Sequence, residues 1–393
     1  METFLPYVLD WANLLLRWLH VIVAIAWIGA SFYFVWLDNS LHPPKDAALQ
    51  AQGVNGELWA VHGGGFYNPQ KYMVAPRHLP EQLHWFYWEA YATWLSGFAL
   101  FCVLYLFNAK TFLVDPQVLN ITPGTAVGLA LGFLAVGWLV YDTLCRVLAK
   151  QAERVLGLLI VAYVVLASYV ACHVFSGRAA FLIIGAMLAT SMSANVFVWI
   201  IPGQRKVIAS MKAGEEPDPI HGQRGKQRSV HNTYFTLPVL FAMMSNHYSM
   251  TYTHAHNWLV LVLIMVAGVL IRQFFVLRHK GVVNWSFPIA AVAVLTAVAV
   301  WIAPTPAPVQ ANSGPAPVLA DVMPIIEQRC VMCHNAQLAS KNVRLDSPEA
   351  VQKQAALIHQ QAVVTRIMPM NNATGITEAE RTTLARWFEA GAR

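Results

Sequence analysis

Two cysteines and a histidine near the C-terminus follow the spacing Cys330-x-x-Cys333-His334. This is the spacing at which a c-type haem is attached: each thiol adds to a vinyl group, and the histidine becomes an axial iron ligand. A zinc knuckle or a thiol redox pair uses the same residue types. Zinc, however, would need two more ligands, and the tail offers only His359 besides. The sequence therefore predicts a covalent haem c, with His334 on its iron.

Methionines downstream of this run could supply the second axial ligand. A thioether in that position raises the potential of a haem. We predict Met368, directly before Pro369, as the distal ligand, with Met370 as its rival. The following segment, 377–392, is predicted to form a helix capped by Thr377, with an acidic residue three positions on. It resembles the closing helix of small class I cytochromes c.

The rest of the chain has the composition of a membrane protein. Hydrophobic residues make up 57% of the sequence and charged residues only 12%, about half of the charged share of a soluble domain. A helix needs about 20 apolar residues to cross the hydrocarbon layer. We count eight such runs, at residues 14–37, 84–107, 123–144, 152–173, 179–201, 233–247, 256–278 and 285–303. The predicted fold is all-α: an eight-helix transmembrane bundle followed by a small class I cytochrome c domain.

The composition changes again after the last predicted span. Residues 304–318 are rich in proline and alanine, which predicts an extended, semi-rigid linker. We therefore predict a membrane domain over residues 1–303 and a cytochrome c domain over residues 319–393.

Charge and haem attachment predict the same orientation. Bacteria attach haem c outside the cytoplasmic membrane, so the tail should lie outside, and eight spans then place the N-terminus outside as well. The loops expected in the cytoplasm hold most basic residues, whereas the loops expected outside hold only Lys110 and Arg178. This bias follows the positive-inside rule. Because the basic residues lie at membrane edges, the net charge of +6 does not predict nucleic-acid binding.

Ionisable residues within predicted spans are costly and usually functional. One group lies toward the outer face and includes Arg17, His20, His173 and His247. Two neutral imidazoles from different helices could ligate a haem b, with His20 and either His247 or His173 as the pair. The alternative is that Arg17 and His20 only form hydrogen bonds between helices.

A second group, toward the inner face, combines a carboxylate, amides, imidazoles and a guanidinium. Its members are His84, Glu89, Asn195, Arg205, His231 and Asn232. With tryptophans nearby, this mixture suits a planar, nitrogen-rich anion. The alternative is that the aromatic residues form an interfacial belt and the histidines cap helices. Asp142 and Arg146, four residues apart, are predicted to pair on one helix.

Three segments, residues 84–97, 195–204 and 229–248, resemble the bacterial membrane-bound urate oxidase (urate hydroxylase) family. A polytopic domain followed by a cytochrome c tail also resembles that family. The resemblance implies that urate and water give 5-hydroxyisourate, two protons and two electrons. The electrons would pass to haem c and then to a downstream cytochrome c or a terminal oxidase, in the bacterial inner membrane.

The implied reaction needs a general base to take a proton from urate or water. Glu89 and His231 are predicted for that role, and Arg205 or Arg77 for holding the anion. The other predicted substrate contacts are His84, Asn195 and Asn232.

Two other functions fit the same sequence. The chain could be a quinol–cytochrome c oxidoreductase with the inner group as its quinone site, or a non-catalytic haem-tethered transporter or assembly factor. The amide side chains favour a purine over a quinone, because amides match a ring of alternating donors and acceptors.

Overall fold

The computed structural model describes residues 4–73, 75–148, 153–303, 315–337, 339–340 and 343–393. In this part of the chain, six helical segments are long and apolar enough to cross a membrane, as expected of a multi-pass membrane protein. They lie in α1 (Phe4–Ser40), α3 (Trp88–Phe101) with η1 (Cys102–Leu106), α5 (Pro123–Val147), α6 (Glu153–Val174), α7 (Gly177–Ala194) with η2 (Asn195–Ile200) and α8 (Ile201–Lys212), and α11 (Asn257–His279).

Two of the eight predicted spans fall in helices that are too polar or too short to count as candidate membrane spans. The run 233–247 belongs to α9 (Pro219–Met244), whose first half is polar. The run 285–303 belongs to α12 (Ser286–Trp301), which is apolar but only 16 residues long. At 1.5 Å per residue such a helix covers about 24 Å, less than the hydrocarbon layer of about 30 Å. The predicted count of eight spans is therefore not confirmed.

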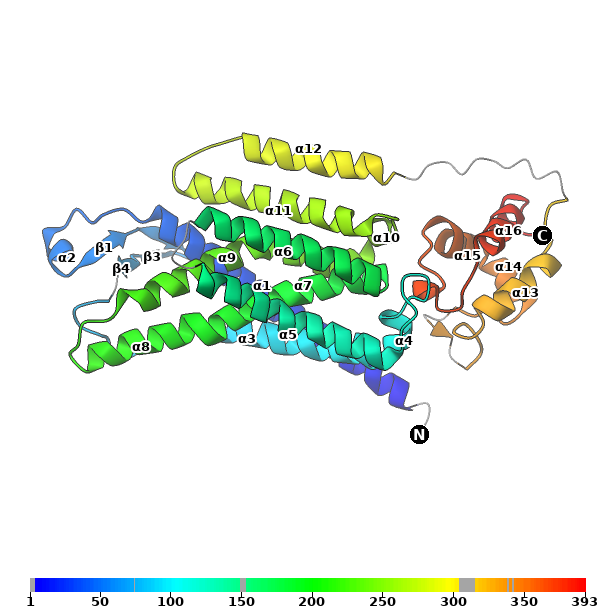
Figure 1. Cartoon of the computed structure of the whole chain (residues 1–393), viewed down its shortest axis with the longest axis horizontal. Coiled ribbons are helices and arrows are strands. Elements are labelled where there is room, and N and C mark those ends of the chain that lie inside the picture. The colour runs from blue at the N-terminus through cyan, green and yellow to red at the C-terminus, as the bar shows by residue number, and fades with distance from the viewer. Residues whose placement is uncertain (1–3, 74, 149–152, 304–314, 338, 341–342) are drawn as a thin grey trace.

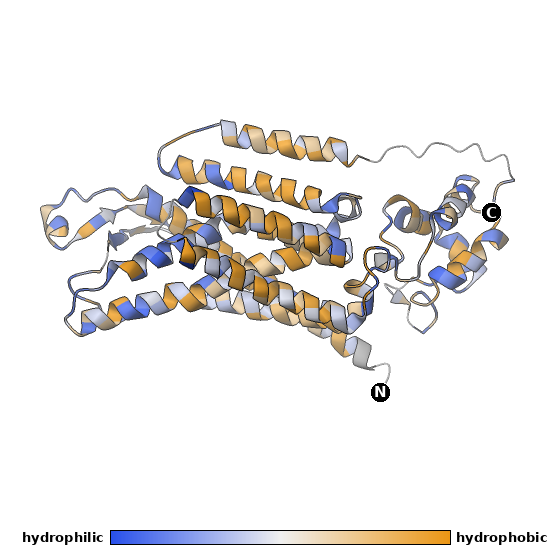
Figure 2. Cartoon of the chain, in the orientation of Figure 1, coloured by the Kyte–Doolittle hydropathy of each residue, from blue (hydrophilic) through white to orange (hydrophobic). Residues whose placement is uncertain are grey.

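The bundle is organised around α7, which packs against α5, α6 and α9, while α11 packs between α9 and α12 and α1 lies along α3. Figure 2 shows that apolar residues dominate the helices of the bundle. Many of them, such as Leu158 and Ile289, are exposed on its outside, whereas Phe181 and Leu261 are fully buried inside. An apolar exterior of this kind suits contact with lipid.

A small β-structure joins α1 to α3 at one end of the bundle, which we call the hairpin end (Figure 1). It follows α2 (Ala47–Ala51) and pairs β1 (Val54–Glu57) with β4 (Gln70–Tyr72), and β2 (Ala60–His62) with β3 (Gly65–Tyr67), all antiparallel. Gly63 and Gly64 both have positive φ, +57° and +81°, which closes the inner hairpin tightly. The chain is mostly helical as predicted, but the all-α prediction lacked these four strands.

The C-terminal tail lies at the opposite end of the bundle, which we call the tail end (Figure 1). Three short elements lie there: α4 (Ala109–Phe112), η3 (Ser245–His247) and α10 (Ser249–Tyr252). The tail contains α13 (Leu319–Arg329), α14 (Pro348–Lys353), α15 (Ala355–Ile358), η5 (His359–Val364), η6 (Met370–Asn372) and α16 (Glu378–Glu389). These helices enclose a hydrophobic core of their own around Trp387. Most of the predicted linker, residues 304–314, lies outside the described residues.

Candidate functional site

A buried polar cluster in the bundle centres on the carboxylate of Asp142 in α5. Its Oδ1 accepts hydrogen bonds from Trp199 Nε1 and Arg228 Nη2, both at 2.7 Å. Its Oδ2 accepts one from Arg146 Nε at 2.6 Å, which confirms the predicted pair. The side chains of Asp142 and Arg228 are only 5% and 3% exposed, whereas that of Arg146 is 56% exposed. One buried and one surface guanidinium therefore balance this carboxylate.

Three of the predicted site residues, Asn195, His231 and Asn232, are linked beside this ion pair, with Tyr141 as the bridge to the histidine. Asn195 Nδ2 donates to Tyr141 Oη at 3.0 Å and to Asn232 Oδ1 at 2.9 Å. The same tyrosine hydroxyl lies 2.9 Å from His231 Nδ1. Asn195 and Asn232 are buried, so these amides and the histidine form a connected network inside the bundle.

The Arg228 guanidinium joins the two sets, because it stacks over the Tyr141 ring at 5.1 Å. We use the name polar cluster for Tyr141, Asp142, Asn195, Trp199, Arg228, His231 and Asn232. Within the described residues, two buried atoms of this cluster have no hydrogen-bond partner: Arg228 Nη1 and Asn195 Oδ1. Leaving such a group unpaired destabilises a protein by about 1–3 kcal/mol. A ligand that offers both an acceptor and a donor could pair both atoms.

Local sequence signals explain how the helices present these side chains. Asp218 caps α9 by accepting a hydrogen bond from Ile220 N, and Pro219 occupies the first turn. Arg228, His231 and Asn232 follow at i, i+3 and i+4, so they share one face of the helix. On the facing helix, the π-helical η2 begins at Asn195. Wide turns of this kind often occur at functional sites.

The other predicted residues of the inner group lie apart from the polar cluster. Glu89 is in the first turn of α3, and its Oε2 is buried without a partner among the described residues. His84 is exposed and packs edge-on against Phe86 at 4.6 Å. Arg205 is exposed and lies 6.0 Å from the ring centre of Trp85. In the part of the chain that the structure describes, no hydrogen bond or ring contact links these three side chains to the polar cluster.

His20, in the middle of α1, and His247, in η3 at the tail end, occupy different environments. His20 Nδ1 lies 3.0 Å from Ser96 Oγ, and its ring fills a space on α3 that the missing side chain of Gly97 leaves open. His247 is exposed in η3. Within the described residues, no hydrogen bond or ring contact joins the two imidazoles. A haem b therefore stays a prediction from the sequence.

The residues of the Cys-x-x-Cys-His run suit covalent haem. Burial raises the pKa of the Cys330 thiol to about 11, so this sulfur is protonated at neutral pH, while Cys333 is exposed. His334 Nδ1 lies 3.2 Å from the carbonyl oxygen of Val343. Because a carbonyl only accepts, Nδ1 carries the proton, and Nε2 is the nitrogen that can bind iron. His359, the extra ligand that a zinc knuckle would need, instead stacks on Phe388 at 4.3 Å.

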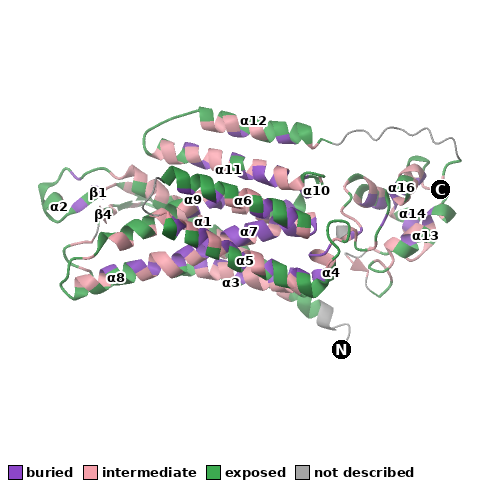
Figure 3. Cartoon of the chain, in the orientation of Figure 1, coloured by how far each residue is buried: buried purple, intermediate pink, exposed green. Residues whose placement is uncertain are grey.

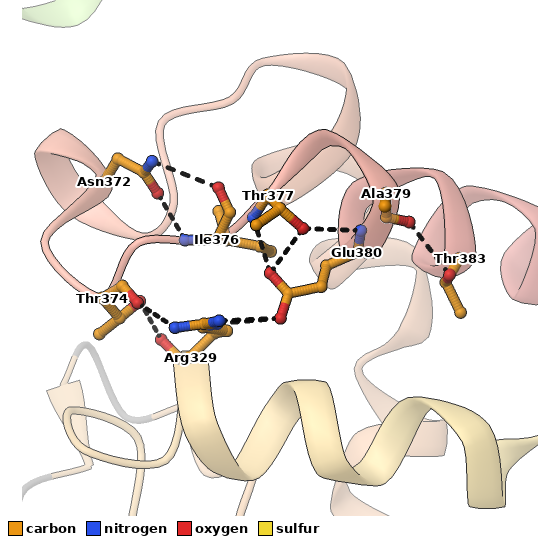
Figure 4. Close-up of polar contacts among 8 residues, drawn as sticks. All are labelled: Arg329, Asn372, Thr374, Ile376, Thr377, Ala379, Glu380 and Thr383. Atoms are coloured by element: carbon orange, nitrogen blue, oxygen red, sulfur yellow. Dashed lines mark hydrogen bonds and ion pairs between the residues drawn. The ribbon is translucent and has the colours of Figure 1, made fainter. Parts of the chain in front are cut away.

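Arg329, directly before Cys330, ties this run to the closing helix α16 (Figure 4). Its Nε and Nη2 donate to Glu380 Oε1 at 3.1 and 3.0 Å. Glu380 Oε2 accepts from Thr377 N at 2.6 Å, and Thr377 Oγ1 accepts from Glu380 N at 3.2 Å. The predicted capping of this helix by Thr377 is confirmed. The capping box therefore also fixes the end of α13, from which the cysteines follow.

The two candidate methionines differ in what their side chains do. The thioether sulfur of Met370 accepts a hydrogen bond from Arg178 Nη1 of the bundle at 3.8 Å. Met368 is held through its backbone, whose N–H donates to Gln361 O and whose carbonyl accepts from Arg381 Nη1, both at 3.0 Å. The Met370 sulfur is thus engaged by the bundle, whereas Met368 is fixed through its backbone inside the tail.

A family model described as urate oxidase N-terminal matches residues 6–303, which cover the whole bundle and the polar cluster. The chain belongs to this family. No curated protein and no solved structure matches it. Membership supports a urate-related activity of the oxidoreductase type. The match ends at residue 303, so it does not include the C-terminal tail.

The sequence missed two residues of the urate oxidase domain that the polar cluster needs. The hydropathy pattern places Arg228 in a loop, because the apolar run of the sixth predicted span begins only at residue 233. The signal that could have found it is the helix start at Asp218-Pro219, which makes α9 continuous through Arg228. Tyr141 gave no signal beyond its position next to Asp142.

Proposed function

We propose that the chain oxidises urate to 5-hydroxyisourate in the membrane and passes the electrons to a haem c in its tail. The observation that carries this proposal is the unpaired donor and acceptor of the polar cluster, Arg228 Nη1 and Asn195 Oδ1, in a chain of the urate oxidase N-terminal family. Urate is a flat anion whose ring edge alternates carbonyl oxygens and N–H groups. It therefore offers the partners that both atoms lack.

In this proposal Arg228, rather than Arg205, holds the anion. The Arg228 side chain is buried and stacks over the Tyr141 ring at 5.1 Å and the Trp199 ring at 5.2 Å. Arg205 is exposed at the protein surface. A charge interaction is stronger when water is excluded, so the buried guanidinium is the better match. Asn195 Oδ1 would accept from a ring N–H.

His231 is the proposed general base of the cluster. Its Nδ1 lies 2.9 Å from Tyr141 Oη, so the tyrosine can orient the ring while Nε2 takes a proton from urate or water. Glu89 is the second candidate, because it is a carboxylate with an unpaired buried oxygen on α3. Ser193 Oγ, near the end of α7, donates a hydrogen bond to the carbonyl of Ala90 in the first turn of α3. Glu89 directly precedes Ala90, and Ser193 lies two residues before Asn195, so this contact brings Glu89 toward the polar cluster.

The reaction balances as urate plus water giving 5-hydroxyisourate, two protons and two electrons. When bound at Cys330, Cys333 and His334, a haem c would accept these electrons one at a time at its iron. The residues of the tail hold that position through the His334–Val343 hydrogen bond and the Arg329–Glu380 contacts. A downstream cytochrome c or a terminal oxidase is the proposed final acceptor.

The proposed topology is an eight-span protein of the bacterial inner membrane with both termini outside. Its support is the positive-inside bias of the sequence, together with the arrangement of the chain: the tail and the hairpins lie at opposite ends of the bundle (Figure 1). Urate would then enter from the cytoplasm. Asp142 lies only five residues before Val147, the last residue of α5, at the hairpin end.

An anaerobic mixing experiment tests the function. The purified chain is mixed with urate or with a quinol analogue, and the reduction of its covalent haem is followed by absorbance. We expect reduction by urate, with 5-hydroxyisourate formed at one molecule per two electrons. Reduction by the quinol alone would assign the chain to the quinol–cytochrome c class, and no reduction by either would favour a non-catalytic role.

A further inference from the structure

Arg178, in the first turn of α7, is fixed at the tail end by contacts within the bundle. Its Nε donates to Asn246 Oδ1 at 3.2 Å, and the same oxygen accepts from Tyr105 Oη at 3.1 Å. The guanidinium also lies 5.7 Å from the ring centre of Phe112 in α4. Tyr105 is only 3% exposed, so the hydrogen bonds that position Arg178 are anchored in the buried part of the bundle.

The free side of this guanidinium faces the tail. Arg178 Nη1 lies 3.8 Å from Met370 Sδ, a distance at which sulfur can accept a hydrogen bond. Two further contacts accompany it: Ile367 packs against the hydrophobic core of the bundle, and η6 packs against α4. Figure 1 shows the loop that carries η6 beside α4. A fixed cation, an apolar anchor and a backbone contact thus meet on one short loop.

We propose that Met370 is the docking residue of the tail: Arg178 binds its thioether and holds the haem-binding domain against the tail end of the bundle, while Met368 serves the iron. One loop then carries two thioethers with separate tasks. The backbone of Met368 is fixed to Gln361 and Arg381 inside the tail, whereas Met370 faces the bundle. A sulfur engaged by Arg178 is not available to a metal at the same time.

This docking also sets the direction from which electrons reach the tail, and that part rests on the proposed function. Met370, two positions after the proposed iron ligand Met368, contacts the bundle directly. Electrons released in the membrane domain would then enter the tail through the loop 367–370, and a soluble acceptor would approach a different face.

Crosslinking tests the docking without urate and without haem reduction. Lys110 on α4 and Ala373 at the end of η6 are both exposed. The full-length Lys110→Cys/Ala373→Cys variant is treated with a short bis-maleimide, and a protease site placed in residues 304–318 then cuts the chain. Crosslinked molecules stay in one piece. Lys110→Cys alone controls for the native cysteines, and Lys110→Cys/Glu327→Cys controls for distance, because Glu327 lies on α13.

Docking variants are compared in the crosslinking background. Losing one net hydrogen bond should lower crosslinking about fivefold in Arg178→Gln and in Met370→Leu, and leave it unchanged in Met368→Leu. Crosslinking that stays at the parent level in both of the first two variants would overturn the proposal. The crosslinking yield measures docking of the tail even if urate is not the substrate.

The absorption band of the iron–thioether bond supplies the second measurement. We expect Met370→Leu to keep this band and Met368→Leu to lose it. Loss of the band in Met370→Leu would overturn the assignment of Met370, whatever the crosslinking shows. If both assignments hold but urate reduces the haem equally fast in Arg178→Gln, the docking stands and only the electron route is refuted.

Discussion

Asp142 and Arg228 form an ion pair whose two side chains are almost completely buried, at 5% and 3% exposure, with 2.7 Å between Oδ1 and Nη2. Such a pair adds little net stability, because both charges lose their hydration, but breaking it is expensive. The pair also holds the guanidinium whose other nitrogen, Nη1, is unpaired. It therefore links the stability of the bundle to the proposed site.

Asp142→Asn should destabilise the bundle by about 3–5 kcal/mol, because it leaves the charge of Arg228 buried without a counter-ion. Thermal or chemical unfolding in detergent measures this. Arg146→Gln is the matched control: the same carboxylate loses a partner, but the lost side chain is 56% exposed, so the loss should be at most about 1 kcal/mol. Equal losses in both variants would contradict the assignment of the buried pair as the structural one.

Asn195→Ala and Glu89→Gln should separate binding from chemistry. Asn195→Ala removes an amide that the ground state and the transition state use alike, so KM should rise about tenfold with little change in kcat. Glu89→Gln keeps the shape of the side chain but removes its basic oxygen, so kcat should fall by a factor of about 100 only if Glu89, the second candidate, acts as the base in place of His231. Urate-dependent haem reduction under steady-state conditions gives both constants.

The comparison variant for this pair is His231→Gln. If kcat falls in His231→Gln and not in Glu89→Gln, the histidine is the base and Glu89 has another role. Normal kcat and KM in all three variants would place the urate site outside the polar cluster.

Local signals in the sequence predicted local structure well. The capping of α16 by Thr377 and the Asp142–Arg146 pair depend on residues three or four positions apart, so both were predictable and both are confirmed. Six of the eight predicted spans also match helical segments of sufficient length and hydropathy among the described residues. The hairpins were missed, because their strands are only three or four residues long.

The composition of the site was harder to predict, because hydropathy gives the depth of a residue along a helix but not the direction in which it points. Asn195, His231 and Asn232 were predicted together and contact Tyr141 or one another. His84 and Arg205 lie at a similar depth, yet both are exposed. Only the packing of α5, α7 and α9 decides which of these side chains face inward.

Gly97→Ala should destabilise the contact between α1 and α3. A Cβ at position 97 would lie 2.8 Å from His20 Cε1, so the imidazole would have to move and its contact with Ser96 would be lost. Overpacking of this kind costs about 1–3 kcal/mol. Gly29→Ala in α1 is the control, because nothing lies within 4 Å of a Cβ there, and the helix should gain up to about 1 kcal/mol.

The double variant Gly97→Ala/His20→Ala should be more stable than Gly97→Ala alone, because removing the ring removes its clash with the new methyl group. Recovery would identify His20 as an interhelical packing residue. A non-covalent haem that is present in the parent protein and disappears in His20→Ala would instead assign His20 to haem b.

Glu380 should make the stability of the tail depend on pH in a defined direction. Partial burial opposes its ionisation, but hydrogen bonds from Thr377 and Arg329 outweigh this and lower the pKa of Glu380 below its ordinary 4.5. A carboxyl whose folded pKa is lowered stabilises the fold above its unfolded pKa and loses this contribution as the pH falls through the folded pKa. Compared with Glu380→Gln, the parent should therefore be more stable by about 1 kcal/mol near neutral pH.

That difference should stay constant down to about pH 5.5 and shrink below about pH 4.5, where the unfolded chain begins to take up the proton. Chemical unfolding of the full-length protein in detergent, followed through the absorbance of the tail, measures it at each pH. Glu378→Gln is the control on the same helix turn: its carboxylate is 71% exposed, so its ion pair with Arg366 should contribute at most about 1 kcal/mol and be weakened by salt. A Glu380 difference that grows as the pH falls would mean that the folded state favours the protonated carboxyl. The contacts to Thr377 and Arg329 would then not be what holds α13 to α16.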